Sequence, residues 1–338
     1  MILGTNNPDT ILPSPVDAAS ITILMDNFSS LLVPDYGPAK RLKTKQQIVV
    51  SHLDDQTTRD NLVAEHGFSA WISITNNNST HSILFDTGIS PFGVSENMSR
   101  LELDPKNATA LVMSHGHNDH TTGIHGIMDA LPSGNTPIII HPDFWNKRRI
   151  YLPESAPSYL PAVNRSSLID NGFDVIHESN QPSFILGKSI LITGEIDRTT
   201  PYEMGMQGQQ RLEGTHWIPD PLTLDDQAIV VNVKGKGLII VTGCGHSGIV
   251  NITRYVKKIT GMNKIHALIG GFHLPDHPRF QKLIDSTLMD LKKINPDWIS
   301  PSHCTGFEAM KKFSEHFPTA FIRNSVGTCF NFKSGIEK

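Results

Sequence analysis

The chain has 338 residues, enough to bury the core of one large α/β domain or of two smaller ones. Its formal net charge of −4 argues against a nucleic-acid partner and a membrane surface, and no apolar run approaches the about 18 residues that a membrane helix needs. Three cysteines are too few for a disulfide framework, so we expect a reducing, cytoplasmic location.

Short β-branched runs predict strands along the chain, and amphipathic stretches between them predict helices. Strands are expected at 20–26, 69–75, 81–88, 108–114, 137–142, 189–196, 227–233, 238–243 and 265–272, and helices at about 94–103, 120–131, 247–260, 278–294 and 306–316. Each half of the chain runs from hairpins into strand–helix units. Two sheets packed face to face, with helices outside, satisfy this order. We expect one domain over 20–338, preceded by an N-terminal extension over 1–19 that does not look like a signal peptide.

Two segments lack clear periodicity, 141–186 and 201–224, and both are expected to be long surface insertions. They carry large aromatic side chains, namely Trp145, Tyr151, Tyr159, Tyr202 and Trp217. One interpretation is an aromatic wall that selects an organic substrate. The other is a set of surface loops packed by their own aromatics.

The most unusual stretch is SHGHNDHTTG (114–123), in which three histidines and one aspartate fall within six positions after an apolar run. In an extended segment, residues two apart face the same way, so His115 and His117 can share one ion. Asp119 and His120 then turn with the start of a helix toward an adjacent space. Imidazole and carboxylate together suit Zn²⁺, Fe or Mn²⁺, so the stretch predicts a metal site.

Three later segments also place a histidine after an apolar run. They are LIIVTGCGHSG, which contains His246, IGGFHL, which ends at His273 and Leu274, and WISPSHCTG, which contains His303. One such histidine alone is as well explained by a loop that satisfies its ring with backbone groups. Three at the same kind of position, each near Gly or Pro, favour a shared site with the ligand loop.

The order of motifs resembles the metallo-β-lactamase superfamily, in the branch related to the archaeal dihydropterin-(ribofuranosyl)aminobenzene-phosphate synthase. The blocks that carry the resemblance are MDNFSS, EHGFSAWI, ILFDTG, SHGHNDHTTG, LITGEI, VTGCGHSGIVN, IGGFHL, PSHCTG and NSVGTCFNF, and together they cover most of residues 20–332. The resemblance implies an α/β fold of the αββα sandwich type, with metal ions at one edge of the sheets.

The resemblance also implies which residues hold metal. His115 and His117 would bind one divalent ion, and Asp119, His120 and His303 would bind a second. Zinc is the expected metal, with manganese or iron as alternatives, and a one-metal site is not excluded. Asp86 in FDTG would hold an imidazole or a loop amide behind the ligands.

Two departures from the superfamily pattern affect this assignment. Most members supply a third histidine to the first ion from an earlier loop, and only His177 and His216 are available here. Cys244 stands where a bridging aspartate is usual, and His246 is the favoured replacement ligand of the first ion. Cys244 has two possible roles, as a metal ligand or as a small buried residue. A Cys244→Ser variant is expected to keep most of its metal.

The expected function is that of a metal-dependent hydrolase, in which a metal-bound hydroxide attacks a small organic ester, phosphoester or lactone-like substrate. Asp119 would orient the water and His273 would protonate the leaving group, although a structural or a ligand role for His273 is an alternative. The resemblance implies a second candidate, a synthase that joins a pterin methyl group to an aminobenzene ribofuranosyl phosphate. For its phosphate the run Lys147, Arg148 and Arg149 is a candidate contact, against the interpretation that these are solvated charges.

Overall fold

The computed structural model describes residues 10–131, 136–176 and 180–335. His177 and the first nine residues of the expected extension lie outside these ranges. Within the described residues, no helix is both long and apolar enough to span a membrane.

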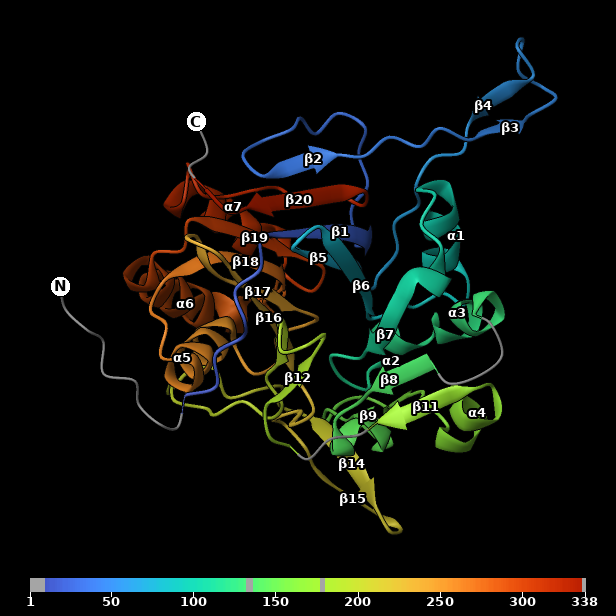
Figure 1. Ribbon diagram of the computed structural model, residues 1–338. Coiled ribbons are helices and arrows are strands. Elements are labelled where there is room, and N and C mark those ends of the chain that lie inside the picture. Colours follow the sequence, from blue (N-terminus) through green and yellow to red (C-terminus); the bar gives the residue numbers. More distant parts are fainter. Residues whose placement is uncertain (1–9, 132–135, 177–179, 336–338) are drawn as a thin grey trace.

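Two mixed sheets form the centre of the molecule (Figure 1). The larger has eight strands in the order β11 (Phe173–Ile176), β8 (Thr136–Ile139), β7 (Ala108–Val112), β6 (Ser79–Phe85), β5 (Ser69–Asn76), β1 (Ala18–Met25), β20 (Thr328–Lys333) and β2 (Ala39–Arg41). The smaller has six in the order β12 (Ser183–Ile185), β13 (Ile190–Ile192), β16 (Ala228–Val233), β17 (Gly237–Thr242), β18 (Ile265–Gly271) and β19 (Trp298–Ser302). Strands β6, β7 and β8 run parallel to one another, as do β17, β18 and β19.

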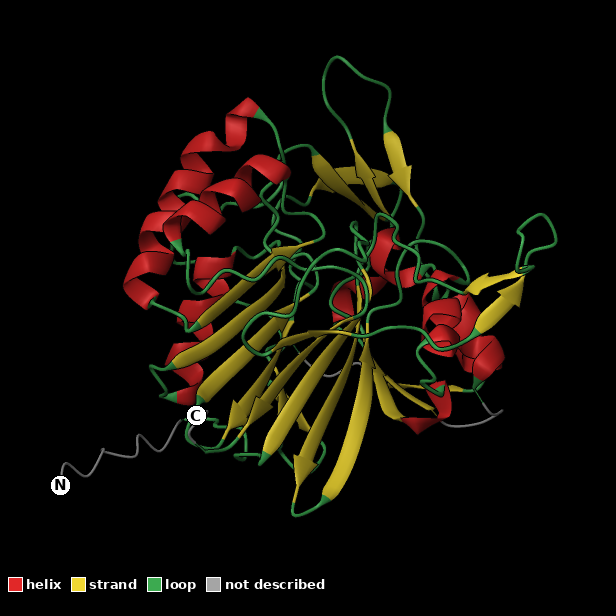
Figure 2. Ribbon diagram, turned by 90° about the horizontal axis from the view of Figure 1, so that it is seen from above, coloured by secondary structure: helices red, strands yellow, loops and turns green. Residues whose placement is uncertain are grey.

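Helices cover the outer face of each sheet (Figure 2). They are α1 (Gly93–Arg100), α2 (Asn118–Thr121), α3 (Ile124–Ala130) and α4 (Arg165–Asp170) in the first half, and α5 (Ile249–Thr260), α6 (Gln281–Ile294) and α7 (Phe307–His316) in the second. Short 3₁₀ turns occur at Pro105–Asn107, Pro142–Trp145 and Pro278–Phe280. The layers are therefore helix, sheet, sheet, helix, as the order of elements predicts.

The inner core lies between the sheets and draws on both halves of the chain. Ile21 and Phe85 from the larger sheet pack in one cluster with Val231 and Val241 from the smaller sheet. Along β16 the neighbouring Val230 faces the other way and packs under α5, α6 and α7. Because both faces of this strand are covered, its first four residues, Ala228 to Val231, are a continuous apolar run rather than an alternation.

The predicted helix over 120–131 is interrupted, which is a correction to the sequence-based expectation. It consists of the short α2 and the separate α3, with Gly123 between them. A Cβ at Gly123 would lie 1.9 Å from the carbonyl oxygen of Thr87, so only glycine allows this loop to pack against the end of β6. The break brings the ligand loop against Thr87, whose N–H donates to the carbonyl of His120.

The two segments expected to be surface loops contain regular structure, which is a second correction. The segment 141–186 includes β11 and β12, which are edge strands of the two main sheets. A separate four-stranded sheet joins the two segments, in the order β10 (Ser158–Leu160), β9 (Arg148–Ile150), β14 (Gln209–Glu213) and β15 (His216–Pro219). Strands of three residues have too little alternation to be recognised, and the β9–β14 pairing joins positions about sixty residues apart.

The sequence analysis also missed a hairpin that projects from the larger sheet, β3 (Gln47–Val49) with β4 (Thr57–Arg59). Figure 1 shows it at the end of the chain segment that follows β2. All six of its strand residues are exposed. A strand without a buried face has no periodic apolar signal.

Candidate metal centre

The candidate ligands converge where loops leave the carboxyl ends of parallel strands. The loop after β7 carries His115 to His120, the loop after β17 carries Cys244 and His246, and the loops after β18 and β19 carry His273 and His303. Carboxyl ends of parallel strands lie at one edge of a sheet, and the packing of the two sheets brings both edges together. Among the described residues, these side chains form groups whose ligand atoms lie within 4.8 Å of one another.

The first group, here called the three-histidine cluster, consists of His115, His117 and His246, all buried. His115 Nε2 lies 3.0 Å from His117 Nδ1 and 3.2 Å from His246 Nε2. Nitrogen ligands of one tetrahedral Zn²⁺, each about 2.1 Å from the metal, are about 3.4 Å apart. The spacing of the three nitrogens is therefore close to that of ligands on one ion.

The protonation of the three-histidine cluster also fits a cation. Burial and the neighbouring imidazoles hold the pKa values of His115 and His246 well below the usual histidine value, and burial with the nearby Arg148 lowers that of His117 to about 4. Ser114 Oγ donates to Asp86 and so accepts from His115 Nδ1, which leaves the His115 Nε2 lone pair facing the cluster. Neutral imidazoles that point lone pairs at one another are unfavourable unless a cation lies between them.

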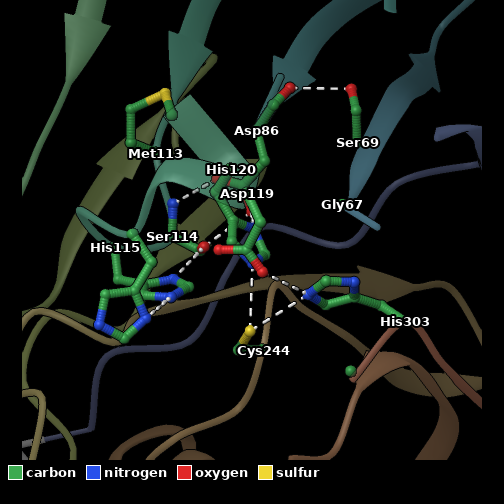
Figure 3. Close-up of polar contacts among 12 residues, drawn as sticks. Gly67, Ser69, Asp86, Met113, Ser114, His115, Asp119, His120, Cys244 and His303 are labelled. Carbon is green, nitrogen blue, oxygen red and sulfur yellow. Dashed lines mark hydrogen bonds and ion pairs between the residues drawn. The ribbon is translucent and has the colours of Figure 1, made fainter. Parts of the chain in front are cut away.

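The second group, here called the mixed cluster, consists of Asp119, His120, Cys244 and His303 (Figure 3). Cys244 Sγ lies 3.1 Å from His120 Nε2 and 3.3 Å from His303 Nε2. Asp119 Oδ2 lies 3.2 Å from His303 Nε2 and 3.7 Å from His120 Nε2. Thiolate, imidazole and carboxylate are all zinc ligands. The position of Cys244 argues against the expectation that its loss would leave the metal in place.

Both imidazoles of the mixed cluster are held from behind. His120 Nδ1 donates to Asp86 Oδ2 over 2.7 Å, and His303 Nδ1 donates to Asn27 Oδ1 over 3.1 Å. Each bond fixes the tautomer that turns Nε2 toward the cluster. The backbone N–H of His303 donates to the fully buried Asp26, which also accepts from Asn324. The predicted supporting role of Asp86 agrees with these contacts, which reach both clusters through Ser114 and His120.

Charge in the mixed cluster is strongly coupled. Burial by itself would raise the pKa of Asp119, but His120 and His303 hold it well below its usual range. Burial would lower the pKa of His120, but Asp119 and Asp86 outweigh it and raise the pKa to about 9. Burial raises the pKa of the Cys244 thiol. Without a metal, the cluster is therefore a carboxylate beside a protonated imidazole and a protonated thiol.

Three residues of the centre adopt left-handed backbone conformations that side chains other than glycine rarely take. Asp86 has φ +58°, His273 has φ +44° and His303 has φ +52°. Such conformations cost about 1–3 kcal/mol each and persist where the surrounding structure fixes them. At Asp86 the fixing contacts are the N–H of Ser114 and the ring of His120. Strain at these three positions is consistent with a functional site.

His273 lies beside the three-histidine cluster rather than in it. Its ring is 4.1 Å from that of His246, its buried Nδ1 has no partner among the described residues, and it groups with Cys244 and Cys304. Burial would lower its pKa, but the neighbouring Cys304 thiol raises it. His273 and His246 line a small cavity together with Met204, Phe272 and Phe280. The position suits a group that meets substrate.

Several residues of the centre were missed by the sequence analysis. Asn27 accepts from His303, and its Nδ2 donates to His66 Nδ1 over 3.1 Å. That leaves His66 Nε2 facing Asp119 Oδ2 at 3.5 Å, with the His66 side chain 63% exposed at the mouth. Both residues lie in the motifs MDNFSS and EHGFSAWI, which were recognised as family blocks without a role.

The basic run of the first insertion is solvated only in part: Lys147 is exposed, as one interpretation expected, but Arg148 is not. Arg148 is buried and donates to both oxygens of Asp225 and to Asp220. Asp225 in turn accepts from the N–H of Gly116, so Arg148 supports the ligand loop and is not free for a phosphate. Arg149 lies over the ring of Trp217 at 4.5 Å.

The remaining candidates lie away from the two clusters. His216 is exposed in β15 and belongs to none of the candidate metal groups of the described residues. The proposed wall of aromatic residues is not what lines the cavity beside His246: of the second insertion, Glu203, Met204 and Gly205 reach it. Tyr202 turns outward and donates to Asp290. Tyr159 and Trp217 pack against each other in the four-stranded sheet.

Glu203 holds this part of the second insertion in place. Its carboxylate accepts from the N–H groups of Val250 and Asn251 in the first turn of α5, over 3.0 Å and 2.8 Å. Burial raises its pKa to about 7, against the lowering effect of these bonds. Because α5 begins just after His246, the contact fixes the 203–205 loop beside the three-histidine cluster.

Comparison with known proteins agrees with the motifs. Residues 67–257 match the metallo-beta-lactamase superfamily. The 7,8-dihydropterin-6-methyl-4-(beta-D-ribofuranosyl)-aminobenzene-5'-phosphate synthase of Methanocaldococcus jannaschii is 32% identical over 276 residues, which cover 80% of this chain and 90% of that protein. An uncharacterized protein of the same organism is 31% identical over 272 residues, covering 79% and 94%.

A solved structure supports the fold. The crystal structure of a metal-dependent hydrolase of the beta-lactamase superfamily has a TM-score of 0.69 and 21% identity, over 94% of this chain and 100% of that chain. The resemblance inferred from the motifs and the αββα fold are thereby confirmed. On these matches and this architecture, the chain belongs to the metallo-beta-lactamase superfamily.

Proposed function

We propose that the protein is a metal-dependent hydrolase that cleaves a small organic ester, phosphoester or lactone, with zinc as the preferred metal. The observation that carries the proposal is the pair of ligand clusters, which lie together at one buried edge. Of the ligands, His246 also lines the small cavity beside His273. A bound divalent ion would supply Lewis-acid activation of water and of the scissile group. His115, His117 and His246 would hold one ion, and Asp119, His120, Cys244 and His303 a second.

The chain's own groups have defined tasks in this proposal. Asp119 is a proposed ligand whose side chain is partly exposed (15%), and its carboxylate can orient a water molecule for attack. His273 lines the cavity and its buried Nδ1 has no partner among the described residues, so its ring is available to donate a proton to a leaving oxygen. The cavity has a volume of about 30 Å³, room for a water molecule and not for an organic group, so Met204, Phe272 and Phe280 would shield the ring of His273 from bulk solvent.

A synthase activity is the second candidate, and the similarity to the archaeal synthase favours it. In that reaction the same edge would bind an activated pterin and an arylamine in place of water. Of the run that the sequence suggested for its phosphate, Arg148 is bound to two aspartates and is not free, whereas Lys147 is exposed and Arg149 stacks on Trp217.

The two candidates are separated by paired assays on the metal-loaded protein. A panel of phosphodiester, aryl ester, lactone and β-lactam substrates measures hydrolysis, and a pterin pyrophosphate with an arylamine measures coupling. The proposal expects hydrolysis of at least one panel member that is lost on chelation and restored by a divalent metal. Coupling without hydrolysis would replace it by the synthase, and hydrolysis that persists in metal-free protein would refute it.

A further inference from the structure

A second cavity lies on the N-terminal side of the metal centre and has a distinct chemistry. It has a volume of about 380 Å³, and its walls include Arg41, Lys43 and Arg59 with the hydroxyls of Ser29, Ser30 and Ser325. No carboxylate is among the described residues that line it. We call it the basic pocket. Its size is within the about 300–1,000 Å³ of small-molecule sites.

The positive charge of the basic pocket is only partly offset by the protein, through Asp35, which accepts from the backbone N–H of Arg41 and raises the pKa of its guanidinium against the larger effect of burial. Arg41 is half-buried, and its guanidinium donates only to neutral oxygens, the carbonyls of Pro34 and Arg323 and the hydroxyl of Thr328. Burial lowers the pKa of Arg41, so its charge is held at some expense of free energy. Lys43 and Arg59 have no ion-pair partner among the described residues.

The acidic residues that neighbour the basic pocket in sequence are already paired elsewhere. Asp60, next to Arg59, accepts from Arg100 over 2.8 Å. Glu102 pairs with Lys45, and Asp35 pairs with Lys40. Three cations around one cavity, with no carboxylate among the described residues of its lining, favour an anionic ligand. Hydroxyls beside cations are typical of phosphate recognition.

Two chain segments that line the basic pocket also contribute residues to the metal centre. Ser29 follows two residues after Asn27, whose Oδ1 is 3.1 Å from His303 Nδ1, and two residues of extended chain span at most about 7 Å. On the opposite wall, Leu62 is followed by Glu65, whose N–H donates to Asp26 over 3.2 Å, and then by His66 beside Asp119. Ser30 N–H donates to Ser325 Oγ, in the turn before β20, and both residues line the pocket. The basic pocket and the mixed cluster therefore lie close together, on the same two chain segments.

We propose that the basic pocket binds the phosphate of an organic phosphate monoester whose reacting group lies at the metal centre. The inference rests on the proposed function for the reacting end, but the pocket makes its own contacts. Lys43 and Arg59 bind the phosphate oxygens from the open side, and Arg41 supplies the fixed charge at the base. The substrate is thus a phosphorylated compound in which the phosphate is retained and a separate bond is cleaved.

Direct binding tests the pocket. Isothermal titration of phenyl phosphate into the metal-loaded protein is compared with the Lys43→Ala/Arg59→Ala double variant and with Lys282→Ala/Lys311→Ala, which removes two exposed lysines on α6 and α7. We expect the first variant to bind phenyl phosphate at least tenfold more weakly and the second to bind like wild type, with metal content unchanged in both. Equal affinity in all three proteins, equal weakening in both variants, or tighter binding of benzoate than of phenyl phosphate would overturn the proposal.

Kinetics separate a failure of the pocket from a failure of the proposed function. Two aryl esters that differ only in a distal phosphate are compared in wild type and in the Lys43→Ala/Arg59→Ala variant. We expect the KM of the phosphorylated ester, relative to that of the neutral ester, to rise about tenfold in the variant. If both esters are hydrolysed and the KM ratio is unchanged, the phosphate site is refuted and the proposed hydrolase stands. If the variant loses phenyl phosphate binding but neither protein hydrolyses either ester, the phosphate site stands and the proposed hydrolase is refuted.

Discussion

The two ligand clusters differ in how they are charged and in how they are held. The three-histidine cluster is neutral, and the outer nitrogens of His117 and His246 have no partner among the described residues. The mixed cluster contains a carboxylate and a thiol, and the outer nitrogens of His120 and His303 are both bound. The two clusters at this edge would therefore bind metal in different ways. One offers only neutral imidazoles, and the other offers a carboxylate and a thiol together with two imidazoles that hydrogen bonds hold in place.

The largest effect that separates the clusters is loss of a ligand. His115→Ala should lose the ion of the three-histidine cluster, and Cys244→Ala that of the mixed cluster, so each variant falls from two ions per chain to one. The Cys329→Ser variant is the control, because Cys329 is a buried thiol in β20 that belongs to no metal group of the described residues. Elemental analysis after dialysis measures the content. Two ions retained by Cys244→Ala would remove the thiol from the ligand set.

The next effect is the dependence of metal affinity on pH. The histidines of the first cluster have lowered pKa values, about 4 for His117, so they carry no competing proton between pH 6 and 8. In the mixed cluster the pKa of His120 is about 9 and that of Cys244 is raised, so an ion must displace protons there. Affinity at the mixed cluster should rise about tenfold per pH unit for each proton released.

Chelator competition on the two variants measures these slopes, because each retains one cluster. We expect a flat profile for Cys244→Ala from pH 6 to 8 and a rising one for His115→Ala. Equal slopes would mean that the clusters do not titrate as separate groups.

A smaller effect comes from the residues behind the ligands. Asp86 contacts both clusters, through Ser114 and through His120, whereas Asn27 contacts only His303 among the ligands. Asp86→Asn should weaken both ions by roughly 10–100-fold and Asn27→Ala only the second by a similar factor. Asparagine tolerates the left-handed backbone at position 86, so the fold is kept. Stepwise metal titration reads the two affinities, and a loss confined to one ion in Asp86→Asn would contradict the shared support.

The smallest effect on metal affinity is expected from His66, at the exposed side of the mixed cluster. His66 is largely exposed and lies 3.5 Å from Asp119, a contact of the kind that solvent weakens. His66→Gln should change the affinity of the second ion by no more than about fivefold. The same titration measures it, and a change as large as that of Asn27→Ala would place His66 among the ligands or their main supports.

The sequence allowed the site to be predicted where ligands are contiguous or follow apolar strands. His115 to His120 occupy one loop, and His246 and His303 stand at strand ends beside glycine or proline. Cys244 could not be assigned, because a ligand and a small buried thiol differ only in where Sγ points. Asn27 could not be found either, since it meets His303 across 276 positions and carries no ligand chemistry of its own.

The fold shows the same division. Strands buried on both faces, such as β16 and β17, were predicted within about a residue because their apolar runs are continuous. The four-stranded sheet and the hairpin β3–β4 were missed, since strands of three to five residues with partly or fully exposed faces carry no periodic signal. Arg59, the last residue of the missed hairpin, also lines the basic pocket.

The most direct test of the two-cluster account is anomalous diffraction from crystals of the metal-loaded protein, with data collected on both sides of the metal absorption edge. The account predicts two peaks. One should contact His115 Nε2, His117 Nδ1 and His246 Nε2, and the other should contact Asp119, His120 Nε2, Cys244 Sγ and His303 Nε2. A single peak, or a second peak without Cys244 in contact, would contradict it.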